Sequence, residues 1–188
     1  MTQIGAIALI LGLTIGSCFL RPGGNSETVS PVSIEDLSDG QKLITNESEG
    51  IRLTIPEGWE LVEELRPDAD IYAANEPENM YVMVLADDED SLIGEFDLAD
   101  NARQYRSIIV RQLDQYEGQT PTSVTSVNGQ PAEQYEIRGQ IDNTPIVYLH
   151  TTIRGEANYY QVVGWTRADR YETAQRQLQD VVETFRGA

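Results

Sequence analysis

Residues 50–59, GIRLTIPEGW, are the part of the sequence that best indicates the fold. Over 51–55 apolar and polar side chains alternate, which is typical of a strand with one buried face. The proline and glycine that follow are turn residues, so we expect the strand to end after Ile55. Trp59 lies directly beyond the turn, and a tryptophan beside apolar neighbours most often packs into a core. The stretch therefore predicts a half-buried strand followed by a tight turn.

Further segments of the chain carry strand patterns. Apolar or alternating runs predict strands over 70–74, 80–86, 123–127, 132–138, 145–153 and 159–165. The run MYVMVLA at 80–86 is apolar without alternation, which favours a strand covered on both faces. Asn128-Gly129 and the stretch 155–158 are hairpin signals, and strands linked by hairpins pair antiparallel.

Two segments carry helix patterns. One extends from Asp97, as its N-cap, to about Glu117, with its apolar residues on one stripe. The other begins with Thr166 and Asp169 as a capping pair and ends near Phe185. Strands, a helix, hairpin-linked strands and a final helix indicate the α+β class. We predict a largely antiparallel sheet of about six to seven strands with helices on both faces.

The chain of 188 residues is acidic, with 31 acids, 13 bases and a net charge of −18. This charge disfavours nucleic acid, whose phosphates are bound by Lys and Arg, and it disfavours docking onto anionic lipid headgroups. Residues 57–100 hold fifteen of the acids and a single base, Arg66. This stretch is either a solvated face that maintains solubility or a docking surface for cations or a basic partner.

The densest acidic cluster is Asp87, Asp88, Glu89 and Asp90. We predict that these residues contact a membrane or envelope protein complex with a basic surface. The alternative is an envelope lipoprotein that binds Ca²⁺ or Mn²⁺ weakly in this loop, because carboxylate oxygens suit hard cations. The spacing does not fit an EF-hand, because leucines occupy the sixth and twelfth positions counted from Asp87. Apart from such a cation, the sequence predicts no cofactor.

The amino-terminal segment has the pattern of an export signal. Residues 4–20 are apolar almost throughout and carry no charge. They include Ile15-Gly16-Ser17-Cys18, which resembles the bacterial lipobox, and the resemblance implies lipidation of Cys18 and cleavage before it. No Lys or Arg precedes the apolar run, so an uncleaved anchor is the alternative. Acyl chains on Cys18 would hold the protein on the exoplasmic side of a membrane, in the periplasm, at the cell surface or in the thylakoid lumen.

Three parts of the chain follow from these patterns. We predict a lipoprotein signal peptide over 1–17, a flexible tether over 18–49 and one folded domain over 50–188. The tether prediction rests on the abundance of Gly, Ser, Pro, Asn and acids between 19 and 49. Such a segment would lift the domain away from the anchoring surface.

Catalytic motifs are missing from the sequence. His150, the sole histidine, lies in a predicted strand, where a packed or hydrogen-bonded role is common. A hydrolase that works through His150 is the enzymatic hypothesis that remains, since a Ser–His–Asp triad needs one histidine. No Gly-x-Ser-x-Gly elbow, phosphate-binding Gly-rich loop or His-Glu-x-x-His motif occurs. We therefore predict a protein that is not an enzyme.

Three segments resemble PsbP-like domains, whose fold is shared by PsbP, the DcrB-type lipoproteins and the Ran-binding Mog proteins. They are GIRLTIPEGW at 50–59, VNGQPA at 127–132, which resembles the central hairpin, and the closing strand and helix over 159–186. The resemblance covers residues 50–186 and implies a non-enzymatic domain that binds other proteins or assists their assembly. PsbP-like members are associated with photosystem II on the lumenal face of photosynthetic membranes. The resemblance therefore also implies a photosystem II accessory.

Overall fold

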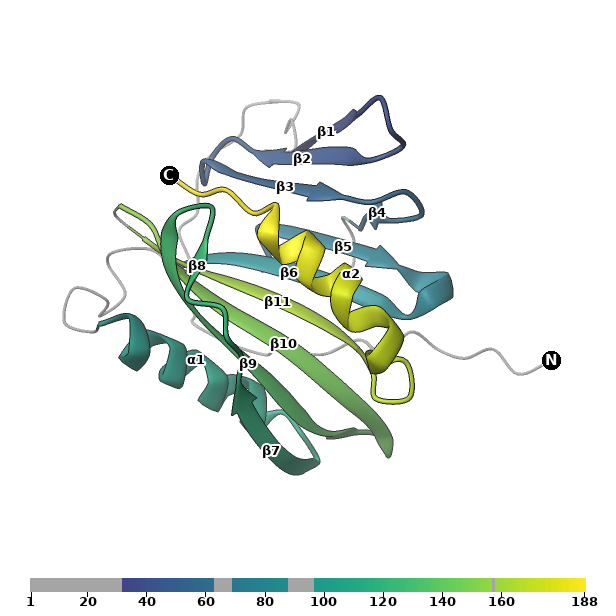
Figure 1. Ribbon diagram of the computed structural model, residues 1–188, viewed down its shortest axis with the longest axis vertical. Helices are drawn as coiled ribbons and strands as arrows, with labels where there is room; N and C mark the ends of the chain where they lie inside the picture. Colours follow the sequence, from purple (N-terminus) through teal and green to yellow (C-terminus); the bar gives the residue numbers. More distant parts are fainter. Residues whose placement is uncertain (1–31, 63–68, 88–96, 157) are drawn as a thin grey trace, which may run out of the picture. The chain divides into compact units, whose positions relative to one another are not determined.

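The larger sheet of the protein is antiparallel throughout (Figure 1). The computed structural model describes residues 32–62, 69–87, 97–156 and 158–188. Within these residues the sheet has eight strands, in the order β4-β5-β6-β11-β10-β9-β7, with β8 paired to β9. Its strands are β4 Glu60–Leu61, β5 Ile71–Asn75, β6 Met80–Asp87, β7 Gln115–Pro121, β8 Ser126–Val127, β9 Gln130–Ile141, β10 Thr144–Arg154 and β11 Tyr159–Arg167. A 3₁₀ turn, η1 (Glu76–Glu78), links β5 and β6.

A smaller sheet is formed by the first strands of the described chain. Its strands are β1 Val32–Asp36, β2 Lys42–Asn46 and β3 Ile51–Ile55, in the order β1-β2-β3. On β3 the side chains of Ile51, Leu53 and Ile55 are fully buried, whereas Arg52 is exposed. The alternation predicted for this strand is therefore confirmed. Trp59 is also fully buried, as its position after the turn predicts.

The structure corrects the predicted tether over 18–49. The last part of that segment forms β1 and β2, and Ile44 of β2 is fully buried in the core. β2 pairs with β3 over its whole length, from Lys42 opposite Ile55 to Asn46 opposite Ile51. Strand formation depends on such pairing and on burial more than on local composition, which here is rich in turn residues and acids. The part of the predicted tether before residue 32 lies outside the described residues.

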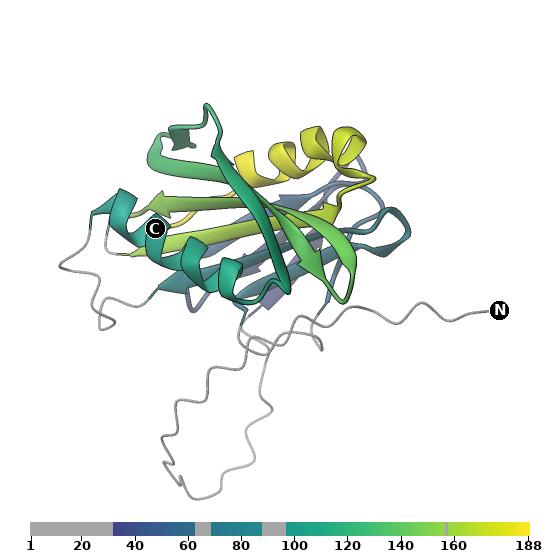
Figure 2. The ribbon, with the colours of Figure 1, turned by 90° about the horizontal axis from the view of Figure 1, so that it is seen from below.

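The two helices cover opposite faces of the larger sheet. They are α1 Leu98–Arg111 and α2 Tyr171–Glu183. Neighbouring residues of a strand point to opposite faces, and on β11 Gln161 donates to Asn101 of α1, with 2.7 Å between the two side-chain atoms. The next residue, Val162, belongs to the same core cluster as Leu178 of α2. Figure 2 shows the helices on the two sides of the sheet. The predicted α+β sandwich is confirmed.

Helix α1 is shorter than predicted. It begins after its N-cap Asp97, whose side chain accepts from the N–H of Asp100, but it ends at Arg111 instead of near Glu117. The residues that follow form β7, an edge strand paired with β9, and Tyr116 is 46% exposed. By its spacing, Tyr116 fits the apolar stripe of the predicted helix. The pairing of β7 with β9 nevertheless places it in a strand.

Helix α2 begins later than its predicted capping pair. Thr166 lies within β11, and Asp169 instead forms an ion pair with Arg167 at 3.1 Å. The N-cap position is occupied by Arg170, which makes no side-chain capping hydrogen bond. The buried stripe of α2, with Leu178 and Val182 at its centre, is the one that the helical spacing indicates.

Candidate functional site

The chain beyond α2 forms a strap that lies along β3. We use "strap" for residues 184–188. The hydroxyl of Thr184 accepts from the N–H of Thr54 (3.0 Å) and donates to the carbonyl of Thr54 (2.9 Å). Two residues further on, Arg186 and Arg52 exchange both of their backbone hydrogen bonds, at 2.8 and 3.0 Å. The strap therefore extends the smaller sheet antiparallel to β3.

The other side of the strap is bound by the larger sheet. The amide of Asn128, in the turn between β8 and β9, donates to the carbonyls of Glu183 and Phe185, each at 2.7 Å. The hydroxyl of Tyr160 donates to the carbonyl of Ala188 at 3.1 Å. The strap thus connects the smaller sheet to the hairpins of the larger one. Asn128 suits this turn because its φ of 48° is left-handed, which asparagine tolerates better than most residues.

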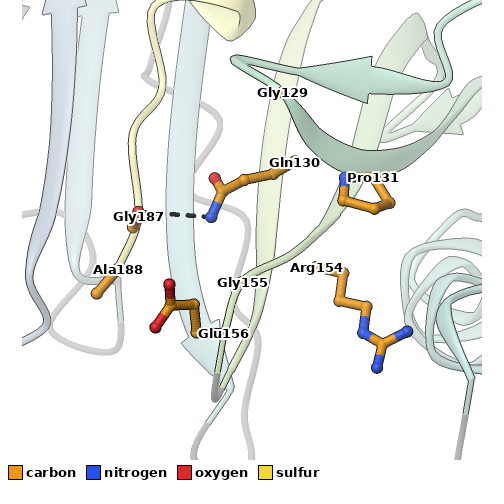
Figure 3. Close-up of a pocket in the computed structure, with 8 residues that line it drawn as sticks. All are labelled: Gly129, Gln130, Pro131, Arg154, Gly155, Glu156, Gly187 and Ala188. Carbon is orange, nitrogen blue, oxygen red and sulfur yellow. Dashed lines mark hydrogen bonds between the residues drawn. The ribbon is translucent and has the colours of Figure 1, made fainter.

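Two pockets adjoin the strap, and both are lined by Gly187 and Ala188. The larger, with a volume of about 490 Å³, is also lined by 129–131 and by 154–156, where β10 ends and its hairpin begins (Figure 3). Figure 3 shows the amide of Gln130 reaching the carbonyl of Gly187. The smaller pocket, of about 230 Å³, is lined in addition by residues of β2, β3 and the turn between them, and by Arg186.

Close packing of the strap requires glycine at position 187. A Cβ placed there would come closer than van der Waals contact to three carbons of the Tyr160 ring, which is 1% exposed. Gly155 is constrained in the same way, because a Cβ there would lie 2.6 Å from the carbonyl oxygen of Ala188. The shape of the pockets therefore depends on the close approach of the backbone at Gly155 and Gly187 to its neighbours, as well as on side chains.

Three arginines line these pockets, and all three are exposed. They are Arg52 and Arg186 in the smaller pocket and Arg154 in the larger. Within the part of the chain that the structure describes, none of them forms an ion pair. In Figure 3 the side chain of Arg154 points away from the strap. The smaller pocket is thus lined by two arginines and one acid, Glu47, and the larger by one arginine and one acid, Glu156.

The acidic cluster predicted to bind a partner is only partly described. Asp87 is the last residue of β6, and its backbone pairs with Tyr159 of β11, which in turn lies opposite Arg154 of β10. β6 therefore ends at the same end of the sheet as the larger pocket. Asp88, Glu89 and Asp90 lie outside the described residues, as does Cys18. Partner binding, cation binding and lipidation at these residues stay predictions.

His150 lies in a buried polar network beneath α1. Its side chain is fully buried, its ring stacks on Tyr105 with centroids 5.2 Å apart, and its Nε2 lies 2.9 Å from the side-chain oxygen of Gln161. The same oxygen accepts from the hydroxyl of Thr152 at 2.7 Å. Because that oxygen accepts, Nε2 carries the hydrogen of the neutral ring. Nδ1 has no hydrogen-bond partner among the described residues.

Burial makes His150 a structural residue. Desolvation lowers the pKa of its imidazole to about 4; the hydrogen bond with Gln161 acts against this shift, and the positive charge of Arg106 adds to it. The ring is therefore neutral at pH 7. A fully buried ring cannot contact a substrate, so the structure contradicts the hydrolase hypothesis for His150.

The described residues provide no metal centre. No group of three or more His, Cys, Asp or Glu side chains among them is placed to hold a metal ion. Among the helices that the structure describes, none combines the length and apolarity that crossing a membrane requires.

Sequence reasoning missed the strap and the two arginines that face each other across it and β3. By sequence, Arg52 is one polar position of an alternating strand, and Arg186 belongs to the end of the predicted closing helix. These residues are far apart in the chain, and no local pattern indicates that they lie opposite each other. No surplus of Arg marks the end of the chain either, since residues 101–188 hold ten acids and nine bases.

Comparison with known proteins identifies the fold. No protein-family model matches the chain, and no curated protein matches it in sequence. The solution structure of cyanobacterial PsbP (CyanoP) from Synechocystis sp. PCC 6803 matches with a TM-score of 0.55 and 15% identity, over 93% of this chain and 99% of that chain. This likeness shows that the chain has the PsbP-like fold, as the resemblance predicts.

Two further solved structures are similar at lower scores. LpqN of Mycobacterium tuberculosis, which is involved in cell envelope biogenesis, has a TM-score of 0.47 and 14% identity, over 72% of this chain and 81% of that chain. PA94 of Pseudomonas aeruginosa, a protein of unknown function, has a TM-score of 0.44 and 11% identity, over 81% of this chain and 94% of that chain.

Proposed function

We propose that this protein is a non-enzymatic accessory, tethered to the exoplasmic side of a membrane, whose PsbP-like domain binds a membrane protein complex. The observation that carries the proposal is the likeness in fold to cyanobacterial PsbP over nearly the whole of both chains. A fold by itself does not define a function, so the proposal also needs a contact surface and a location.

The proposed contact surface is the acidic stretch over 57–100, with Asp87, Asp88, Glu89 and Asp90 at its centre. This stretch holds fifteen acids and a single base, and a surface of one sign attracts a partner of the opposite sign. Support for its position comes from β6, which ends at Asp87 beside the β10–β11 hairpin. A partner on this surface would therefore also contact that end of the sheet.

The proposed location depends on the lipobox-like segment that ends at Cys18. Two or more acyl chains would anchor the chain without a spanning helix, and the segment between the anchor and β1 would separate the domain from the membrane. In a photosynthetic host, photosystem II is the first complex to test, because PsbP-like proteins are associated with it. In any other host, the test is made on the envelope complexes.

The proposal is tested by crosslinking and affinity purification of the tagged full chain from membranes of its own host, at low and high salt. We expect a stoichiometric protein complex that salt releases. In the variant with Asp87→Asn, Asp88→Asn, Glu89→Gln and Asp90→Asn, we expect weaker recovery of the complex and a flatter dependence on salt.

A matched control neutralises four exposed acids elsewhere, with Glu35→Gln, Glu172→Gln, Asp180→Asn and Glu183→Gln. These changes alter the net charge by the same amount, so they separate a specific surface from total charge. Equal recovery of the complex with both variants would contradict the contact surface. Recovery of the chain alone from the membrane fraction would contradict the accessory role.

A further inference from the structure

Arg52 and Arg186 form a pair of like charges across the strap and β3. They exchange both backbone hydrogen bonds, so they are directly opposite residues of an antiparallel pair, with Cα atoms about 5.5 Å apart. Side chains of directly opposite residues stand on the same face of a sheet. Two guanidinium groups therefore project side by side from this face, and like charges in such a position destabilise the pairing.

No carboxylate among the described residues neutralises this pair. Glu47 lines the same pocket, yet it forms no ion pair with either arginine. Four of the seven other exposed arginines in the described residues have acidic partners, with nitrogen–oxygen distances between 2.5 and 3.6 Å, namely Arg103, Arg138, Arg167 and Arg170. Arg111, Arg154 and Arg176 are also exposed and form no ion pair among the described residues, so what distinguishes Arg52 and Arg186 is that their two unpaired guanidinium groups lie side by side.

The surroundings of the pair supply further hydrogen-bond donors. Thr45 of β2 lies opposite Arg52 and on the same face, and it lines the 230 Å³ pocket. The backbone N–H groups of Gly187 and Ala188 donate to no acceptor within the described part of the chain. A guanidinium group binds phosphate oxygens through two parallel N–H donors. The pocket thus combines two guanidinium groups with several neutral donors, beside a single acid, Glu47.

We propose that the pocket between β3 and the strap binds a phosphate group through Arg52 and Arg186. A phosphate monoester carries a charge of about −1.5 to −2 at pH 7, which matches two guanidinium groups, whereas one carboxylate would leave a positive charge. The site is independent of the proposed partner surface, because it uses none of the residues of that surface. Its ligand is inorganic phosphate or a small phosphate ester.

The test is a titration of the ¹⁵N-labelled full chain in nonionic detergent, followed by NMR and by calorimetry. The probes are inorganic phosphate and sn-glycerol 3-phosphate, with acetate at matched ionic strength as the reference anion. We expect saturable shifts of the backbone amide signals of Arg52, Arg186 and Gly187 with both phosphates. If sn-glycerol 3-phosphate binds more tightly than inorganic phosphate, the ligand is a phosphate ester of the kind found in lipid headgroups. If the two bind equally, the ligand is the free phosphate ion.

Variants at the two arginines make the test specific. Arg52→Gln and Arg186→Gln should each weaken phosphate binding by about tenfold or more, because each removes a charge-assisted pair of hydrogen bonds. Both side chains are exposed, so these variants should fold. Arg52→Lys keeps the positive charge but loses the planar guanidinium group with its two parallel N–H donors. It should therefore weaken phosphate binding less than Arg52→Gln does.

Arg154→Gln is the matched control, because Arg154 is also exposed and unpaired but points away from the strap (Figure 3). It should leave phosphate affinity within about twofold. Three results would overturn the proposal: no saturable shift at these amides, equal affinity for acetate and phosphate, or equal loss of affinity in Arg154→Gln and Arg52→Gln.

Discussion

At the scale of single residues, His150 couples the stability of the protein to pH. Its imidazole is fully buried and neutral, with a pKa lowered to about 4, whereas an exposed histidine in the unfolded chain titrates near 6.5. As the pH falls below about 6.5, the unfolded state takes up a proton that the folded state does not. The contribution of His150 to stability is therefore fully present above this range, and it is lost as the pH falls towards 4.

We predict that His150→Gln removes this part of the pH dependence. Between pH 7.5 and pH 5.0, His150 should cost the wild-type protein about 2 kcal/mol of unfolding free energy. The measurement is urea unfolding, followed by tryptophan fluorescence, of both proteins at the two pH values. Acidic groups titrate in both proteins, so the difference between them isolates the histidine. Equal losses in the two proteins would show that the imidazole is protonated, or exposed, in the folded state.

The surroundings of each arginine decide whether it is available to a ligand. Arg106 is 6% exposed, and its guanidinium lies over the ring of Tyr135 at 3.5 Å and 3.9 Å from Glu133. Arg52 and Arg186 are exposed and without such partners. Composition counts these residues alike, although one is part of the packing under α1 and the others face a pocket.

At the scale of elements, the strap is the piece that unites the two sheets. It makes hydrogen bonds to β3 on one side and to the turn before β9 and Tyr160 of β11 on the other. Phe185 of the strap is fully buried and packs against the Tyr160 ring, with centroids 5.2 Å apart. The strap is therefore part of the core, and its position determines the shape of both pockets.

We predict that Gly187→Ala destabilises the protein by about 1–3 kcal/mol, because the new methyl group would overlap the buried Tyr160 ring. Chemical unfolding of the variant gives the change. Tyr160→Leu removes most of the ring, so Gly187→Ala should cost less in that background, and the double-mutant cycle measures this coupling. An equal cost in both backgrounds would mean that the strap does not pack on the ring.

Helices, strands and turns were predicted correctly where neighbouring residues in the sequence specify them. The strand over 51–55, the turn at Asn128-Gly129 and the buried stripe of α2 are specified by neighbouring residues, and the structure contains all of them. β1, β2 and β7 depend on partners elsewhere in the chain. β1 and β2 lie in a stretch rich in turn residues, and β7 contains Gly118 and Pro121. The pairing of β1 with β2, of β2 with β3 and of β7 with β9 therefore decides their conformation.

At the scale of the whole molecule, the proposed anchor and the domain are separate parts of one chain. Within the described residues the chain forms one compact unit, whereas Cys18 lies outside them. The domain has the PsbP-like fold, and the anchor is a prediction from the lipobox-like residues around Cys18. Location and binding can therefore be tested separately.

We predict that lipidation depends on Cys18. In the native host, wild-type protein should incorporate a clickable fatty-acid analogue, and Cys18→Ala should not, because the thiol is the acceptor. Cell fractionation should then find the variant depleted from the membrane. Ser26→Ala, in the same segment, is the control and should be labelled like the wild type. A variant that stays in the membrane without label would support the uncleaved anchor.

The sequence by itself determined the fold class, the hairpin order of the later strands and the acidic character of the protein. Those properties follow from short-range periodicity, turn residues and composition, which do not depend on contacts between residues that are distant in the sequence. It also directed attention to Asp87–Asp90 and Cys18, for which local chemistry is informative.

Only the tertiary structure decided the strap, the pairing of Arg52 with Arg186 and the burial of His150. Each requires residues that are distant in sequence to meet: the end of the chain with β3, and α1 with β10 and β11. Such contacts are stabilised by the packing of the assembled core, and no window of neighbouring residues encodes them. The phosphate site that we propose therefore follows from the folded protein alone.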